Sequence, residues 1–560
     1  MRRRAVTVIC LAATALACRT PTTAERATLI IHNAQVYTSH VGQPTAQAVA
    51  VRGDRIVLIG SSQAALELRG PETRVVDADG GTLLPGLQDS HGHFTELGAS
   101  LQVLQLRGTT SYDEIVQMVR TRAATARPGE WIEGRSWDQN DWPVKEWPHH
   151  QPLTDAAPTN PVYLTRVDGH AALVNKMALD AAGVTSNTPD PPGGRVIRDD
   201  KGEPAGVLID SAQDLVAAKI PEPTAAQLED QILLADGQAR RLGLTSVHDA
   251  GTTPTVVAAY KRLIDAGKLK TRLYAMLRGP MSMLEPEFKR GPLINYANHH
   301  LSVRAIKIGA DGALGSRGAA LLEPYSDEPT TSGLMTTPPN EIYAQTLAAA
   351  RAGFQTCIHA IGDRGNRVAM DVFERVQREV PGARDLRMRN EHAQILDAAE
   401  IPRFATLNVI ASMQATHATS DMPWVPARIG RQRMEEGAYV WKRLLATGVV
   451  LANGSDFPVE EPNPMLGFYA SITRQDPKGQ PPGGWMPEER MTRDEMLKSF
   501  TWNGAYASHT EKDLGSIELG KLADLVLLDK NVMTVEPREI LSTQAIMTII
   551  GGEIVYERNR

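Results

Sequence analysis

Two stretches at opposite ends of the chain share one pattern, in which apolar and polar positions alternate as in half-buried β-strands. The first lies between residues 28 and 80, where Gly53 and Asp54 separate two apolar runs as a hairpin turn would. The second lies between residues 524 and 556. Because unlike material separates the two, we predict one small β-sandwich domain built from residues 18–80 and 511–560.

The pattern changes from about residue 240, where short strand-like runs alternate with longer helical stretches, as in parallel α/β folds. Seven runs are candidate strands: 244–248, 271–277, 304–308, 354–359, 387–392, 409–414 and 449–456. The buried run Gly81–Leu84 supplies an eighth. We therefore predict an α/β fold, a (β/α)8 TIM barrel over residues 81–510.

The stretch between the barrel's first two predicted strands is too long for one crossover, and it predicts an insertion at about residues 100–235. Four of the eight tryptophans of the chain cluster there, at positions 131, 137, 142 and 147. We favour core and interface packing for them over a role as substrate platforms.

The first 17 residues have the pattern of an export signal, with three arginines before a short apolar run. That run is too short to span a bilayer. Ala15-Leu16-Ala17 before Cys18 fits both simple cleavage and a bacterial lipobox, and we favour lipidation of Cys18. We therefore expect an exported protein, periplasmic or an outer-membrane lipoprotein, that touches a membrane only through this anchor. An uncleaved cytoplasmic N-terminus is the alternative.

The composition and net charge limit the classes of partner that we expect. Apolar residues make up 42% of the chain and charged residues 22%, as in ordinary globular enzymes. The net charge is −6 and no basic stripe is present, so we expect a small-molecule substrate and no nucleic acid. Three cysteines suggest no disulfide framework. A homo-oligomer is left open.

Polar residues recur where the predicted strands end, and they include metal-ligand types. His91 and His93 are two residues apart, so both imidazoles can face one ion in an extended chain. Each residue alone has a structural explanation, such as a salt bridge, a satisfied core histidine or a helix cap. The whole set at strand ends favours a metal site instead: His91, His93, Lys307, His359, His392 and Asp456.

These motifs resemble the amidohydrolase superfamily, specifically its amidohydrolase-3 (YtcJ-like) branch, over essentially the whole mature chain. The matching segments are residues 85–93, 131–138, 168–175, 307–317, 391–392, 454–459 and 514–526. The resemblance implies a metal-dependent hydrolase that holds a divalent metal, zinc by preference, as two ions. By it, His91 and His93 bind the more buried ion and His359 and His392 bind the second. A carbamylated Lys307 would bridge the two ions, and Asp456 would be both a ligand and the catalytic proton shuttle. A one-metal site with Lys307 as a plain cation stays open.

Further candidates are assigned to substrate binding. They are Asp168, His170, Arg317 and His417, and for Asp168 and His170 a purely local structural role is equally open. The predicted function is hydrolysis of a non-peptide C–N bond, in an amide, N-acyl or N-formyl group, by water that the metal activates to hydroxide. A deaminase, a carbamate or ester hydrolase, and a non-catalytic secreted binding protein are the alternatives.

Overall fold

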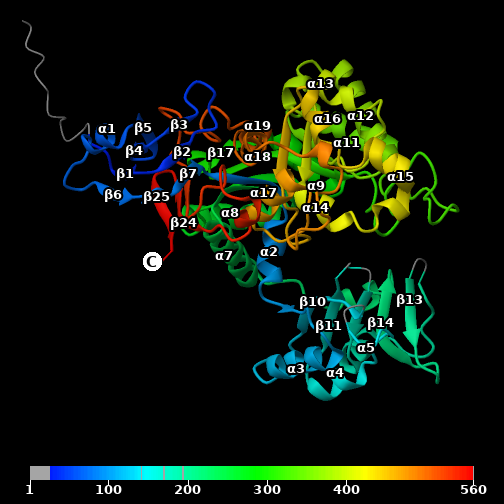
Figure 1. The fold of residues 1–560 in the computed structure, drawn as a ribbon. Coiled ribbons are helices and arrows are strands. Elements are labelled where there is room, and N and C mark those ends of the chain that lie inside the picture. The colour runs from blue at the N-terminus through cyan, green and yellow to red at the C-terminus, as the bar shows by residue number, and fades with distance from the viewer. Residues whose placement is uncertain (1–25, 140–141, 168, 170, 192–193, 559–560) are drawn as a thin grey trace, which may run out of the picture.

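Eight parallel strands form a nearly closed barrel in the computed structural model, which describes residues 26–139, 142–167, 169, 171–191 and 194–558 (Figure 1). Helices such as α8 (Pro254–Asp265) and α12 (Asp363–Glu379) join successive strands. Helices cover the outer face of the strands, so β16 is buried along its whole length. The strands follow chain order around the barrel: β8 (Leu87–Gly92), β15 (Leu244–Thr252), β16 (Arg272–Leu277), β18 (Leu301–Gly309), β19 (Gln355–Ala360), β20 (Arg389–His392), β21 (Ile410–Gln414) and β22 (Leu451–Gly454). The predicted (β/α)8 barrel is confirmed.

The first and last barrel strands meet through a buried carboxylate. Asp89 on β8 accepts a hydrogen bond from the hydroxyl of Ser455 at 2.6 Å and from the N–H groups of Ser455 and His91, both at 3.1 Å. Burial raises the pKa of Asp89 to about 7. The N–H of Asp456 also donates to the carbonyl of His91 at 2.7 Å. Closure of the barrel therefore brings residues 89–93 beside residues 454–457.

A β-sandwich built from both ends of the chain lies beside the barrel (Figure 1). One sheet contains β1 (Leu29–His32), β4 (Ala48–Arg52), β5 (Arg55–Gly60) and β6 (Arg74–Asp77). The second contains β2 (Gln35–Tyr37), β3 (Thr45–Ala46), β7 (Thr82–Pro85), β23 (Leu525–Leu528), β24 (Ala545–Ile550) and β25 (Glu553–Glu557). Apolar side chains from both sheets share one core, which includes Ile31, Val49, Leu83 and Leu527. The predicted composite domain is thus present.

One strand assignment from the sequence is wrong. The run Gly81–Leu84, expected as the first barrel strand, lies at β7, which pairs with β2 and β23 in the sandwich. The barrel strand is the next one, Leu87–Gly92. The chain crosses between the two sheets at Gly86, where a Cβ would lie 2.2 Å from Oγ1 of Thr245. Only glycine permits this approach, so one continuous run serves two sheets.

The insertion forms a separate lobe after α2 (Phe94–Ser100) and before α7 (Ala225–Arg241), below the barrel in Figure 1. Trp137 and Trp142 are buried in its core with their ring centroids 5.9 Å apart. These two tryptophans therefore have the packing role that we favoured from the sequence. Arg135 of β10 donates to the carbonyl of Pro458 at 2.5 Å, a contact between the lobe and the loop after β22. The lobe contains β9 (Leu104–Gln105), α3 (Tyr112–Ala123), β10 (Ile132–Trp137), α4 (Gln151–Ala156), β11 (Val162–Arg166), β12 (Ala171–Val174), α5 (Lys176–Ala182), β13 (Gly194–Arg198), β14 (Pro204–Asp210) and α6 (Asp214–Ala217).

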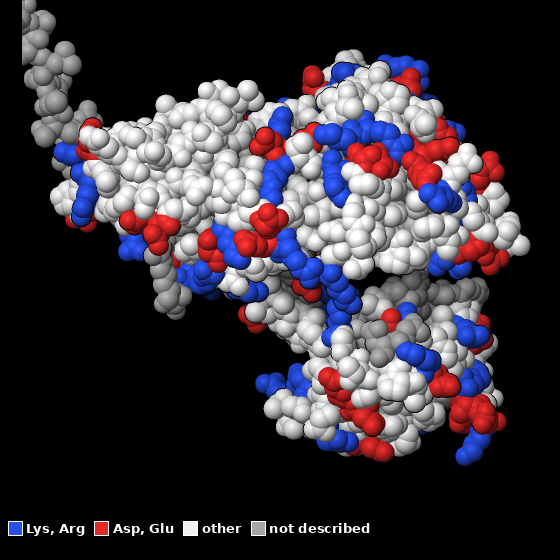
Figure 2. All heavy atoms as spheres, in the orientation of Figure 1, with Lys and Arg blue, Asp and Glu red and all other residues white. Residues whose placement is uncertain are grey.

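Acidic and basic side chains are interspersed on the face of the molecule that Figure 2 draws. No helix within the described ranges combines the length and the hydropathy that a membrane crossing requires. The predicted signal segment and Cys18 lie outside the described residues, as do Asp168 and His170.

Candidate metal centre

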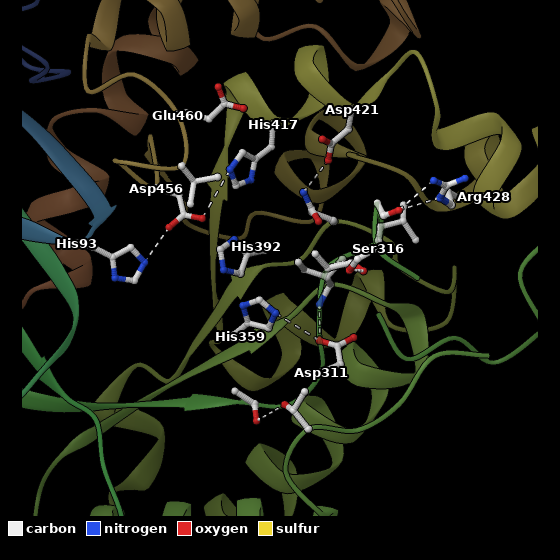
Figure 3. Close-up of a pocket in the computed structure, with 18 of the residues that line it drawn as sticks. His93, Asp311, Ser316, His359, His392, His417, Asp421, Arg428, Asp456 and Glu460 are labelled. Carbon is white, nitrogen blue, oxygen red and sulfur yellow. Dashed lines mark hydrogen bonds and ion pairs between the residues drawn. The ribbon is translucent and has the colours of Figure 1, made fainter. Parts of the chain in front are cut away.

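The barrel brings the six predicted metal residues to the carboxyl ends of its strands. His91 lies in β8, and His93 follows that strand as the N-cap of α2. Lys307, His359 and His392 come from β18, β19 and β20, and Asp456 follows β22. In barrels of this kind the chemistry is at this end of the strands. Figure 3 shows His93, His359, His392 and Asp456 around one cavity.

His91 is oriented by a buried carboxylate. Its Nδ1 lies 2.5 Å from Oε2 of Glu391, and both side chains are fully buried. Its Nε2 therefore faces the site, 3.4 Å from Nζ of Lys307 and 3.5 Å from Oδ1 of Asp456. Burial lowers the pKa of His91 to about 4, so the ring is neutral and can ligate a metal near neutral pH.

Asp456 is shared by two histidines. Its Oδ1 lies 3.0 Å from Nε2 of His93, and its Oδ2 lies 3.6 Å from Nε2 of His417. Burial opposes ionisation of this carboxyl, but the neighbouring histidines outweigh it and hold the pKa of Asp456 well below its usual range. Its backbone has a φ of 58°, a left-handed conformation that is strained for a non-glycine residue. The charged carboxylate is thus held in place over the site.

His392 and His359 form the opposite side of the centre. The ring centroid of His392 lies 4.7 Å from that of His91 and 4.5 Å from that of His359. Nδ1 of His392 contacts Oε1 of Gln414 at 2.8 Å, which leaves its Nε2 for a ligand. Among the described residues, the buried Nε2 of His359 has no hydrogen-bond partner, and Asp311 Oδ1 lies 3.7 Å away.

The donor set fits a divalent metal. Two groups each bring three ligand atoms within 4.8 Å of one another: His91, His93 and Asp456 in one, and His392, His417 and Asp456 in the other. Both ring nitrogens of His417 are buried without a hydrogen-bond partner in the described part of the chain. Imidazole nitrogens and carboxylates are ligands that zinc and similar metals prefer. Without a bound metal, buried ring nitrogens that have no hydrogen-bond partner are energetically unfavourable.

Lys307 lies beside these groups, buried at the end of its strand. Burial lowers the pKa of its ammonium group, so a larger fraction of the amine is neutral than in an exposed lysine.

Of the candidate substrate-binding residues that the structure describes, one lines the cavity and one does not. His417, from α14 (Ala415–Asp421), lines the same cavity as the metal residues. Arg317 does not: its guanidinium pairs with Asp327 at 3.1 Å, and it is not part of the cavity lining. Asp311, earlier in the same loop, accepts the N–H groups of Ala320, Ile361 and Gly362. That loop is therefore tied to the segment between β19 and α12. The structure does not bring Arg317 to the site.

Sequence reasoning missed the network behind His91. Arg389 is fully buried and contacts Glu391 at 2.7 Å, the carbonyl of Ser90 at 2.6 Å and Nδ1 of His248 at 2.9 Å. Burial works against both charges, yet the pKa of Glu391 lies well below its usual range because Arg389 and His91 stabilise the carboxylate. The available signal was that Arg389 and Glu391 lie two residues apart on a predicted strand, so that their side chains face the same side.

Replacement of Glu391 by glutamine is expected to weaken metal binding by about 10–100-fold. A glutamine amide can donate to Nδ1 of His91 and so favour the tautomer that places the proton on Nε2. Competition with a chromophoric chelator measures the affinity. Glu489→Gln is the matched control, because Glu489 is equally buried but pairs with Arg443 away from the centre. Equal affinities in the two variants would contradict the assigned role of Glu391.

A cavity of about 870 Å³ opens above these residues, a size suited to a small molecule. Besides the metal residues, its lining includes Arg278, Trp424, Arg428, Asp421 and Glu460. Figure 3 shows His417, Asp421 and Glu460 on one side of it, opposite Asp311.

Known proteins are similar to this chain along nearly its whole length. The family model described as the amidohydrolase family matches residues 74–556. The putative amidohydrolase YtcJ of Bacillus subtilis is 31% identical over 95% of this chain and 99% of its own. The N-substituted formamide deformylase of Arthrobacter pascens is 27% identical over 95% and 98%.

Among solved structures, an uncharacterized metal-dependent hydrolase from Pyrococcus horikoshii superposes with a TM-score of 0.76. It is 27% identical and covers 91% of this chain and 99% of its own. The resemblance inferred from the sequence motifs is confirmed, and the chain belongs to the amidohydrolase family of metal-dependent hydrolases.

Proposed function

We propose that this chain hydrolyses a C–N bond other than a peptide bond, in an N-formyl, N-acyl or related amide of a small molecule. The observation that carries the proposal is the Asp456 carboxylate, held between His93 and His417 on the wall of a substrate-sized cavity. The similarity of the chain to an N-substituted formamide deformylase supports the same bond type.

A divalent metal, which we propose to be zinc, would polarise the carbonyl and lower the pKa of a water molecule at this site. His91, His93, His359, His392 and Asp456 would hold it. Asp456 takes the proton from the attacking water and delivers it to the leaving nitrogen, a general base and then a general acid. Its depressed pKa supports the first role, because the carboxylate is ionised before the reaction.

We further propose two ions and a carbamate on Lys307. The ammonium group would first lose one proton; the neutral amine would then form an N–C bond with carbon dioxide and release a second proton, which leaves an anionic carbamate that could supply oxygen ligands. The lowered pKa of Lys307 supports this, because only the neutral amine reacts. Mass spectrometry of the intact protein under carbon dioxide, with no 44 Da adduct, would contradict it.

The arginine-led apolar segment before Cys18 supports a proposal of export and lipid anchoring. Recovery of the protein only from the cytoplasmic fraction would contradict this proposal.

The metal-loaded protein should be assayed with N-formyl amines, N-acyl amines, N-acyl amino acids, an aminopurine, a carbamate and an ester. We expect hydrolysis of at least one amide class, loss of that activity after treatment with dipicolinate, and recovery with zinc. Activity that survives removal of all metal would contradict the proposal. Activity confined to the aminopurine, carbamate or ester would favour the alternative chemistries, and an inactive protein that binds no metal would favour the binding protein.

A further inference from the structure

Charged side chains of opposite sign line the cavity after different barrel strands. Arg278 follows β16, the third barrel strand, whereas Asp421 and Glu460 follow β21 and β22, the seventh and eighth. In a closed ring of eight strands the third and seventh stand opposite one another. All three side chains line the cavity that holds the metal residues.

Arg278 pairs with no acidic side chain among the residues that the structure describes. Its side chain is exposed to the cavity. Its stem packs on Gly251, where an added Cβ would lie 3.3 Å from Cδ of Arg278. Arg428, the other arginine of the lining, differs: it donates twice to the carbonyl of Gly315, at 3.0 and 3.1 Å, and pairs with Asp327. Arg278 is therefore the arginine with donors available to a ligand.

The facing wall is acidic. Asp421 accepts hydrogen bonds from the Tyr439 hydroxyl and from Nε2 of Gln394. Glu460 pairs with no basic side chain among the residues that the structure describes. An anionic group that enters the cavity is repelled by this wall and attracted by Arg278, with the metal residues between the two.

We propose that the substrate carries an anionic group, a carboxylate or a phosphate, and that Arg278 binds it and so determines specificity. The planar guanidinium offers a two-pronged donor that matches both groups. The acidic wall receives the uncharged or basic end of the substrate, so the scissile bond is presented in one orientation. The inference builds on the proposed C–N hydrolysis, but anion binding itself requires no turnover.

Calorimetric titration of the metal-loaded full chain tests the inference. The probes are phenylbutanoate, phenylpropyl phosphate and neutral phenylbutanol, none of which has a C–N bond. Arg278→Gln is expected to weaken binding of at least one anion by about tenfold or more and to change the alcohol by less than about twofold. The stronger anion distinguishes carboxylate from phosphate. Arg290→Gln is the control: it removes an arginine of α9 (Met281–Arg290), the helix after the same strand, outside this cavity.

Turnover supplies a second readout. For N-acyl amino acids, Arg278→Gln should raise KM by about tenfold with kcat within about threefold, and the matched N-acyl amines should be unaffected. Anion binding that is absent, or equal in wild type and Arg278→Gln, overturns the inference, and this includes a carboxylate that binds only at the metal. Arg278-dependent binding without hydrolysis of any amide supports the inference and contradicts the proposed function. Hydrolysis of neutral amides alone supports the proposed function and contradicts the inference.

Discussion

Replacement of Asp456 by asparagine is expected to lower kcat about 10²–10⁴-fold on whichever amide the protein hydrolyses. Asparagine keeps the size of the side chain and tolerates the φ of 58° at this position, but it cannot accept the proton from water. The loss should appear in kcat/KM as well as in kcat, since the proton transfer stabilises only the transition state. Steady-state kinetics at saturating metal measure both.

Two measurements separate the roles of Asp456. Metal content after dialysis reports ligation, because the charge of the carboxylate contributes to metal affinity, and kcat at full metal occupancy reports proton transfer. Asp529→Asn is the control, since Asp529 pairs with Arg558 in the β-sandwich and is not part of the metal centre. Wild-type kcat in the Asp456 variant would refute its assignment as the proton shuttle.

Replacement of Asp524 by alanine is expected to lower the free energy of unfolding by about 3–5 kcal/mol. Arg272 at the start of β16 contacts both oxygens of Asp524, at 2.7 and 2.9 Å, across the junction of the barrel and the sandwich. Only 2% and 4% of the two side chains are exposed. Alanine would leave a buried guanidinium without its counter-charge, and urea denaturation measures the cost.

An exposed ion pair provides the comparison. Glu557 pairs with Arg74 at 3.0 Å on the surface of the same sandwich, and Glu557→Ala should cost less than about 1 kcal/mol. A double replacement of Arg272 and Asp524 by methionine and leucine should recover much of the lost stability, because no unpaired charge remains. Equal stability of the two alanine variants would show that the buried pair does not hold the junction.

The alternation of strand-like and helical runs is sufficient to predict the barrel, and the alternation of apolar and polar residues predicts the sandwich. The buried barrel strands β8 and β20 nevertheless carry several polar residues. The prediction from these patterns fails at residues 81–92, where two strands follow each other with only Gly86 between them. A run of buried residues looks the same in either sheet. Only the pairing of β7 with β23, whose residues lie more than 400 positions later, assigns it to the sandwich.

The metal residues are a similar case. The sequence predicts His91, His93, Lys307, His359, His392 and Asp456, because ligand-type residues stand at successive strand ends and a parallel barrel collects those ends in one place. His417 lies on a helix after its strand. The position of strand ends therefore does not predict that its ring lies close to Asp456. Glu391 directly precedes a predicted ligand, yet its contact with His91, 300 residues away, depends on how β8 and β20 face each other inside the barrel.

The sequence by itself therefore determined which residue types reach the centre, because local periodicity defines the strands and the order of the strands places their ends. Only the tertiary structure decided which donors share an oxygen of Asp456, which arginine of the cavity keeps its charge available, and which carboxylate orients His91. These depend on distances between residues that are far apart in the chain, and such distances are set by barrel closure and by packing rather than by any local pattern.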